Sequence, residues 1–215
     1  MGRDELLARM RARGTDERVI AAVASVPREL FVAPALAAAA YVDAPLRIGG
    51  GQTISQPAVV ARMCDLLALS PGDRVLDVGS GSGYHAAVLS RLCRHVYGIE
   101  LEPQLVRAAR RSLAAAGIDN VTIVTGDGAR GLPAQAPFDA INVAATARGE
   151  VPPALERQLA AGGRLVAPVA DGDDERLVLV VNGPDGLERR QLDAVRFVPL
   201  RQAAADPRPL PGDTG

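Results

Sequence analysis

Two glycine-rich segments hold most of the residues whose types and spacing could do chemistry. They are DVGSGSGY at 77–84 and GGGQTISQP at 49–57. Glycine lets a backbone turn sharply and lets a ligand approach it closely. The first segment has the spacing G-x-G-x-G, with Tyr84 where a dinucleotide-binding loop carries its last glycine. Asp77 comes just before the turn, and a carboxylate there suits a ligand with an ammonium group better than a pyrophosphate.

Two more carboxylates follow at the ends of later predicted strands. Glu100 closes the segment HVYGIE, where an acid can bind both hydroxyls of a ribose. Asp127 lies in the segment GDG, where its side chain or the neighbouring backbone can contact an adenine. One acid near an amino-acid head group, one at a ribose and one near a base together describe S-adenosylmethionine. We therefore predict this cofactor, bound by Asp77, Gly79, Gly81, Ser82, Gly83, Glu100, Asp127 and Gly128.

Three other interpretations of these residues stay open. The glycines could serve tight turns only and the acids could cap helices. An NAD-binding domain is the main rival, but the glycine spacing and the lack of an obvious hydride-transfer acid or base weaken it. A non-catalytic binder of the same nucleoside cofactor is the third.

The order of predicted elements defines the fold class. Five predicted strands alternate with helical segments, which indicates βαβ units and a doubly wound, mainly parallel sheet of Rossmann-like type. Two β-rich runs joined by Asn-Gly-Pro-Asp-Gly then predict a closing antiparallel hairpin. Residues 4–24 predict a helical extension broken at Gly14, with Thr15 or Asp16 capping its second helix. The predicted strands are 74–79, 95–100, 121–127, 138–145 and 164–170.

We divide the chain into three parts on this basis. Residues 1–56 form an N-terminal helical lobe with a substrate loop, 57–200 form the Rossmann-like domain, and 201–215 form a disordered tail. A helix starts with Pro57 near its first position and ends at SPGD. The segment 151–163 predicts a short helix that ends in glycine.

Composition excludes several classes of function. The formal net charge is −1 and aromatic residues make up 3% of the chain, which argues against nucleic acid as a partner. The N-terminus lacks the apolar core of a signal peptide and no apolar run reaches membrane length, so we expect a cytoplasmic protein that binds no membrane. Two cysteines and two scattered histidines predict buried thiols and no metal site. We expect a monomer.

Six segments of the chain form a further pattern: VPRELFV, AYVDAPLRIGGGQTISQP, VLDVGSGSGY, FDAINVAAT, VPPALERQLAAGGRLVAPV and VRFVPL. In their order and spacing, these segments resemble the protein-L-isoaspartate O-methyltransferase family. The block GQTISQP with AYVDAPL upstream is the most specific of them, whereas the glycine motif alone marks only the wider class I S-adenosylmethionine-dependent methyltransferases. The resemblance implies methyl esterification of the free carboxylate of L-isoaspartyl residues in damaged proteins or peptides, which leads to a succinimide and repair. It also implies that Ser55 is the catalytic serine.

The residues of the first glycine cluster fit an anionic acceptor. Ser55 or Gln56 falls at the N-cap of the helix that contains Pro57, where free backbone N–H groups and nearby hydroxyls can bind a carboxylate. A carboxylate needs no base near neutral pH, so we interpret Ser55 as a positioning group rather than a nucleophile. Glycines 49–51 would let a substrate backbone approach, although a flexible linker is the alternative. The predicted substrate-binding residues are Arg47, Gln52, Thr53, Ile54 and Ser55.

Two departures from the family pattern leave the acceptor open. Arg47 stands where proline is usual, and its charge would attract acidic peptides. Ala144 replaces a threonine and so removes a hydroxyl near the expected methyl donor. An alternative acceptor is therefore an ordinary aspartate in a ribosomally made peptide, with aspartimide as the result.

Overall fold

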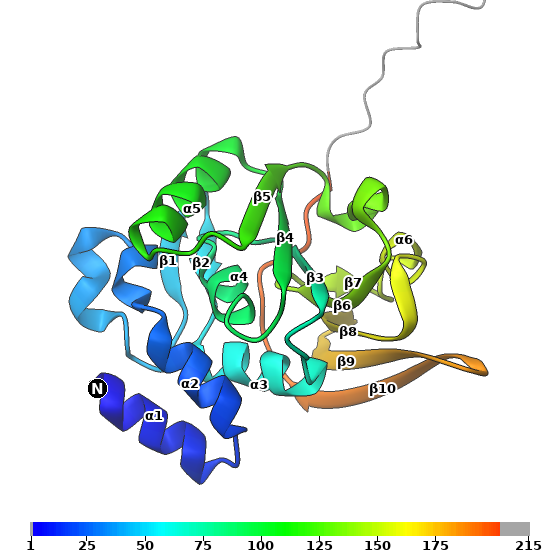
Figure 1. The fold of residues 1–215 in the computed structure, drawn as a ribbon, viewed down its shortest axis with the longest axis horizontal. Helices are drawn as coiled ribbons and strands as arrows, with labels where there is room; N and C mark the ends of the chain where they lie inside the picture. The colour runs from blue at the N-terminus through cyan, green and yellow to red at the C-terminus, as the bar shows by residue number, and fades with distance from the viewer. Residues whose placement is uncertain (1, 203–215) are drawn as a thin grey trace, which may run out of the picture.

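The computed structural model describes residues 2–202, which contain an eight-stranded sheet with helices on both faces and a separate two-stranded sheet (Figure 1). The predicted tail lies outside the described residues from position 203 onward. The helices are α1 Arg3–Ala12, α2 Glu17–Ser25, α3 Pro57–Leu67, α4 Tyr84–Leu89, α5 Pro103–Ala115 and α6 Pro153–Glu156, and the 3₁₀ helices are η1 Arg28–Phe31, η2 Pro34–Ala39, η3 Gly128–Arg130 and η4 Pro133–Gln135. The strands are β1 Leu46–Gly49, β2 Gln52–Ile54, β3 Arg74–Val78, β4 His95–Glu100, β5 Val121–Thr125, β6 Phe138–Val143, β7 Ala147–Arg148, β8 Leu159–Asp171, β9 Asp174–Gly183 and β10 Gly186–Ala194.

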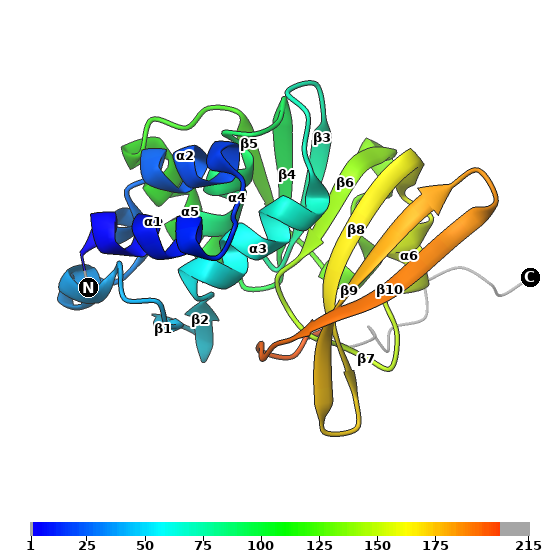
Figure 2. The ribbon, with the colours of Figure 1, turned by 90° about the horizontal axis from the view of Figure 1, so that it is seen from below.

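The sheet confirms the predicted doubly wound class. Its order within the described residues is β10-β9-β8-β6-β3-β4-β5, with β7 paired to β8. The pairs from β8 through β6, β3 and β4 to β5 are parallel, and β9 and β10 add an antiparallel hairpin that projects from the body of the molecule (Figure 2). The order reverses between β3 and β6, which is where an open α/β sheet forms its ligand crevice.

The helix predicted over 151–163 is shorter than expected. It covers only Pro153–Glu156, because Leu159 already pairs with Phe138 as β8 begins. Gln158 holds the chain at this point: its buried amide donates to the carbonyls of Arg130 and Ala154 and accepts from the backbone of Leu132. Strand pairing and a buried side chain therefore outweigh the local helical pattern.

The N-terminal helices share a core with the sheet. Leu6 of α1 and Ile20 of α2 belong to the same buried cluster as Met63 of α3 and Val75 of β3. Asp16 caps α2 by accepting from the Arg18 backbone at 2.7 Å, one of the two caps expected. The N-terminal segment therefore packs as part of the main body.

The first glycine cluster forms a hairpin, so the interpretation as a linker is wrong. Strands β1 and β2 pair antiparallel, with Leu46 opposite Ile54 and Arg47 opposite Thr53. Gly49, Gly50 and Gly51 have φ values of 101°, 58° and 74°, a region that glycine enters without a steric penalty. These glycines serve the turn, and the approach of a substrate backbone to them stays a prediction.

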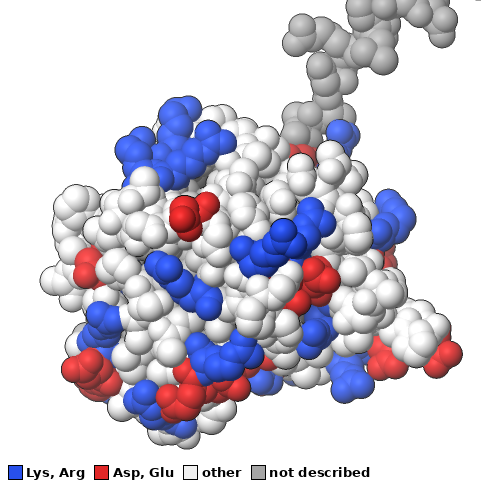
Figure 3. Space-filling view, in the orientation of Figure 1, with Lys and Arg blue, Asp and Glu red and all other residues white. Residues whose placement is uncertain are grey.

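Charged side chains of both signs lie on the surface, and the two thiols are buried. Acidic and basic side chains are interspersed on the face in Figure 3, apart from a basic group over α5. Cys64 and Cys93 are free and buried, as predicted. Among residues 2–202, no group of His, Cys, Asp and Glu is arranged to hold a metal ion, and no helix is long and apolar enough to cross a membrane.

Candidate functional site

A cavity lies at the carboxyl ends of the central strands. The loops after β3, β4, β5 and β6 line it, together with the tip of the β1–β2 hairpin and the segment after β10. Its lining residues are Gln52, Thr53, Gly79, Gly81, Ile99, Glu100, Leu101, Glu102, Gly128, Ala144, Ala145, Val198, Pro199, Leu200 and Arg201. The predicted strand-end residues therefore do converge, although not all of them reach the cavity.

The glycine loop after β3 divides into lining and packing positions. Gly79 and Gly81 line the cavity with φ values of 76° and 52°. A methyl group on Gly81 would lie 3.2 Å from Ile48, so the β1–β2 hairpin packs directly on this loop. Gly83 lies away from the lining: its φ is 84° and a methyl group there would be 3.1 Å from Ala109 of α5. Ser82 is buried and accepts from the backbone N–H of Tyr84.

Glu100 lies in the wall of the cavity, and its contact with a ribose stays a prediction. It ends β4, is 8% exposed, and lines the cavity. Its Oε2 accepts from the Gly81 backbone at 2.9 Å and its Oε1 accepts from the Glu102 backbone at 3.0 Å. These bonds orient the carboxylate, and each oxygen keeps a lone pair for a further donor.

Asp77 lies behind the cavity rather than in its wall. Its side chain is on the face of β3 that carries Val75, fully buried, and its Oδ1 accepts from Asn142 at 2.7 Å. Burial raises the pKa of this carboxyl to about 6. Its Oδ2 has no partner in the structure. Direct contact with an ammonium group remains a prediction that this orientation does not by itself support.

A buried chain of polar groups continues from Asn142, although sequence reasoning found no Cys-His arrangement. The Asn142 amide lies 3.1 Å from His85 Nδ1, and His85 Nε2 lies 3.7 Å from Cys64 Sγ. Burial lowers the pKa of His85 to about 3 and raises that of Cys64 far above its usual value. The imidazole is neutral and the thiol stays protonated, so this chain is structural rather than nucleophilic. His85 lies at the start of α4, as one of the two expectations had it, but it is buried and is not a surface histidine.

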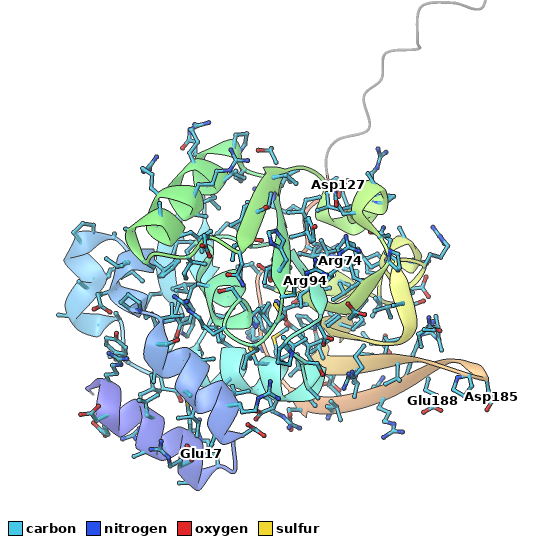
Figure 4. The ribbon with its side chains drawn as sticks, in the orientation of Figure 1. Glu17, Arg74, Arg94, Asp127, Asp185 and Glu188 are labelled. Carbon is cyan, nitrogen blue, oxygen red and sulfur yellow. The ribbon has the colours of Figure 1, made fainter. Side chains whose placement is uncertain are left out.

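Gly128 and Asp127 fall on different sides of one turn. Gly128 lines the cavity, and a methyl group on it would lie 2.7 Å from Val78 Cγ1. Asp127 caps η3 by accepting from the Ala129 backbone at 3.0 Å and lines a neighbouring pocket with Arg130. Figure 4 shows it beside the helical turn that follows β5. Its contact with an adenine remains a prediction.

The segment after β10 closes one side of the cavity, and sequence reasoning gave it no role in the site. Thr146 donates its backbone N–H to Val198 and accepts from Leu200, which ties the segment to the end of β6. Arg201 then forms an ion pair with Glu102 at 2.7 Å. We define residues 195–201 as the strap. Its only sequence signal was the stretch VRFVPL, which local periodicity cannot connect to the cavity.

A second groove adjoins the cavity at Thr53. We define this acceptor groove by its lining residues, which are Pro45, Thr53, Ser55, Gln56, Val59, Ala194, Val195, Arg196 and Phe197. Thr53 lines both spaces, and Gln52 lines the cavity. Ile54 is 4% exposed and packs into the core. Ile54 is predicted to bind substrate, but its side chain is not available for that contact.

The expected anion site at the start of α3 is already filled. The Ala58 backbone donates to Asp43 Oδ1 at 3.0 Å, and those of Val59 and Val60 donate to the Gln56 carbonyl. The prediction of free N–H groups there is wrong, because Asp43 from the preceding loop caps the helix. The Ser55 hydroxyl makes no hydrogen bond within the described residues.

Arg28 anchors the loop that carries Ser55, and sequence reasoning missed it. Its fully buried guanidinium donates to the Ser55 and Ala40 carbonyls, each at 2.8 Å, and lies 4.6 Å from the centre of the Tyr84 ring. Burial lowers its pKa. Arg47 differs: it is exposed, and because it pairs with Thr53 across the hairpin, both side chains project from the same face.

The doubly wound sheet, with a glycine loop and a strand-end acid facing one cavity, has the fold of the class I S-adenosylmethionine-dependent methyltransferases. The chain belongs to the protein-L-isoaspartate(D-aspartate) O-methyltransferase family, whose model matches residues 1–205.

Individual relatives agree with this assignment. The chain is 49% identical over 203 residues to a protein-L-isoaspartate O-methyltransferase of Burkholderia pseudomallei, an alignment that covers 93% of this chain and 63% of that protein. It is similar to a Plasmodium falciparum beta-aspartate methyltransferase solved with S-adenosyl-L-homocysteine (TM-score 0.81, 27% identity, 94% of this chain and all of that one). A further solved protein-L-isoaspartate O-methyltransferase gives a TM-score of 0.83 at 29% identity over 95% of this chain and 67% of that one.

Proposed function

We propose that this protein transfers a methyl group from S-adenosylmethionine to the free carboxylate of L-isoaspartyl residues in damaged proteins or peptides. The single observation that carries the proposal is the position of Thr53, which lines both the cavity and the acceptor groove. A donor in the cavity and a carboxylate in the groove would meet there. The chain spans 63% of the length of the curated relative it matches, and that relative's name supports the same reaction.

The cavity residues fit the proposed cofactor. Gly79, Gly81 and Gly128 present backbone without side chains, and Glu100 presents a fixed carboxylate. Ala144 also lines the cavity, so the position that carries a hydroxyl in the family pattern is apolar here. When bound, the cofactor supplies a sulfonium methyl group that a carboxylate can displace.

The chemistry asks the protein for orientation rather than for a base. A carboxylate with a pKa of about 4 is already ionised near neutral pH. Holding two reactants in line can contribute roughly 7–11 kcal/mol to a rate. Ser55, fixed through its carbonyl by Arg28, has a hydroxyl free to orient one carboxylate oxygen while the other attacks.

The experiment is methyl transfer from labelled S-adenosylmethionine to an isoaspartyl peptide, with wild type and Ser55→Ala compared. We expect Ser55→Ala to lose most of its activity while S-adenosylhomocysteine binding is retained. Loss of cofactor binding instead would show that the two glycine segments have been assigned to the wrong ligands.

A second acceptor is suggested by one observation. Arg47 is exposed, has no partner among residues 2–202, and projects with Thr53 beside the groove. It would favour acidic peptides and keeps an ordinary aspartate as the alternative acceptor. Kinetics of Arg47→Pro on neutral and acidic isoaspartyl peptides test its influence, and an unchanged ratio of kcat/KM would exclude it.

The proposed setting is a monomer acting in the cytoplasm on polypeptide substrates. Two buried, unpaired thiols are in keeping with a reducing compartment.

A further inference from the structure

The acceptor groove holds a cationic side chain that the proposed reaction has not yet used. Arg196 lies in the strap and lines the groove together with Thr53 and Ser55. It is exposed, and it has no hydrogen bond or ion pair within the part of the chain that the structure describes. The other arginine of the strap, Arg201, is paired with Glu102.

A bound carboxylate would need a cationic donor here, because the backbone N–H groups at the start of α3 are already occupied. A carboxylate that leaves water requires several donors in return. The helix N-terminus cannot provide them, since Asp43 and the Gln56 carbonyl already occupy the amides of Ala58, Val59 and Val60. Asp43 is also an anion and would repel a second one placed beside it.

The unused donors of the groove come from two segments that are far apart in the sequence. Thr53 and Ser55 come from the hairpin side, and neither hydroxyl is hydrogen-bonded within residues 2–202. Arg196 comes from the strap. The arginine of α3, Arg62, is already paired with Asp193 at 2.8 Å. Among the described residues that line the acceptor groove, Arg196 is the only one with a formal charge.

We infer that Arg196 binds the carboxylate that becomes methylated, holding one oxygen while the other faces the cavity at Thr53. This rests on the proposed function. The ligand class is a carboxylate on a polypeptide, and the guanidinium supplies the charge-assisted hydrogen bonds that the helix terminus does not. Methylation removes the negative charge, so the ester product loses this contact and its release is favoured.

The test compares two blocked peptides with no other charge. One carries an L-isoaspartyl residue with its free α-carboxylate, and the other carries the same residue as the neutral α-carboxamide. Binding of each is measured in the presence of S-adenosylhomocysteine for wild type, Arg196→Gln and Arg196→Lys. Arg107→Gln is the matched control, because Arg107 is an exposed arginine of α5 with no partner among the described residues.

We expect wild type and Arg107→Gln to prefer the carboxylate about tenfold or more, the value of a hydrogen bond to a charged group. Arg196→Gln should bind both peptides alike, Arg196→Lys should keep part of the preference, and all four proteins should bind S-adenosylhomocysteine equally. A full preference in Arg196→Gln would overturn the inference. Absence of any methyl transfer by wild type that still binds S-adenosylhomocysteine would overturn the proposed function instead.

Discussion

Asp77 and His85 should make opposite contributions to the pH dependence of the free energy of unfolding, and these contributions should cancel. The folded pKa of Asp77 is raised to about 6 from 3.8, so between these values the folded state holds a proton that the unfolded state lacks. The folded pKa of His85 is lowered to about 3 from 6.5, so over the same range the unfolded state holds the extra proton. From about pH 4 to pH 6 the two differences are equal and opposite, and this pair adds no slope to the stability.

Replacing one of these two residues should reveal the pH dependence that the other one causes. In Asp77→Asn only His85 remains, and the free energy of unfolding should fall as pH drops from 6, by about 1.4 kcal/mol for each pH unit relative to wild type. In His85→Gln only Asp77 remains, and stability should rise by about the same amount for each unit of acidification. Burial is the dominant cause of both shifts, so each should survive removal of the other.

The assay is urea unfolding followed by circular dichroism at several values between about pH 4.5 and pH 6, with free energies obtained by linear extrapolation. Over that range the two variants should diverge from wild type by about 2 kcal/mol in opposite directions. His95→Gln is the comparison, since burial and the nearby Arg74 and Arg94 also lower the pKa of this histidine. Its ring is only partly buried, so its loss should change the pH profile less than the loss of His85 does. Parallel pH profiles for wild type, Asp77→Asn and His85→Gln would refute the reasoning.

Three further predictions concern the walls of the site. Gly128→Ala places a methyl group 2.7 Å from Val78 Cγ1 and should lower the free energy of unfolding in urea by about 1–3 kcal/mol, with partial recovery in Gly128→Ala/Val78→Ala. The control is Gly72→Ala, whose new methyl group has no atom within 4 Å. Equal stability of the two single variants would contradict the prediction. Arg28→Met should lower kcat without weakening S-adenosylhomocysteine binding measured by calorimetry, because the Ser55 carbonyl loses its donor; an unchanged kcat would argue against an anchored Ser55. Arg201→Ala and Glu102→Gln should each speed the dissociation of S-adenosylhomocysteine, measured by stopped flow, by up to about fivefold, which is the range expected for loss of an exposed ion pair. The double variant should show no further increase. Dissociation rates equal to that of wild type would show that the strap does not restrain the cofactor.

Much of the fold could be predicted because its signals are local. Strands β3, β4, β5 and β6 are apolar runs that alternate with amphipathic helices, and parallel strands bring their carboxyl ends together. That rule alone placed Glu100, Gly79 and Gly81 at one cavity.

The parts that could not be predicted depend on contacts between distant segments. Asp43 capping α3 and Arg28 bonding to Ser55 each join a loop to a helix start through side chains whose partners no periodicity reveals. The buried chain from Cys64 through His85 to Asn142 joins α3, α4 and β6 in the same way. Arg196 lines a groove together with Thr53 only because the strap returns to the end of the sheet.

The central claim is that the acceptor is the free carboxylate of an isoaspartyl residue. The most direct measurement is methyl transfer from labelled S-adenosylmethionine to two peptides of identical sequence, one containing L-isoaspartate and the other normal aspartate at the same position. The account predicts transfer to the isoaspartyl peptide, little above background to the aspartyl peptide, and loss of the first signal in Ser55→Ala. Equal or greater transfer to the aspartyl peptide would contradict it.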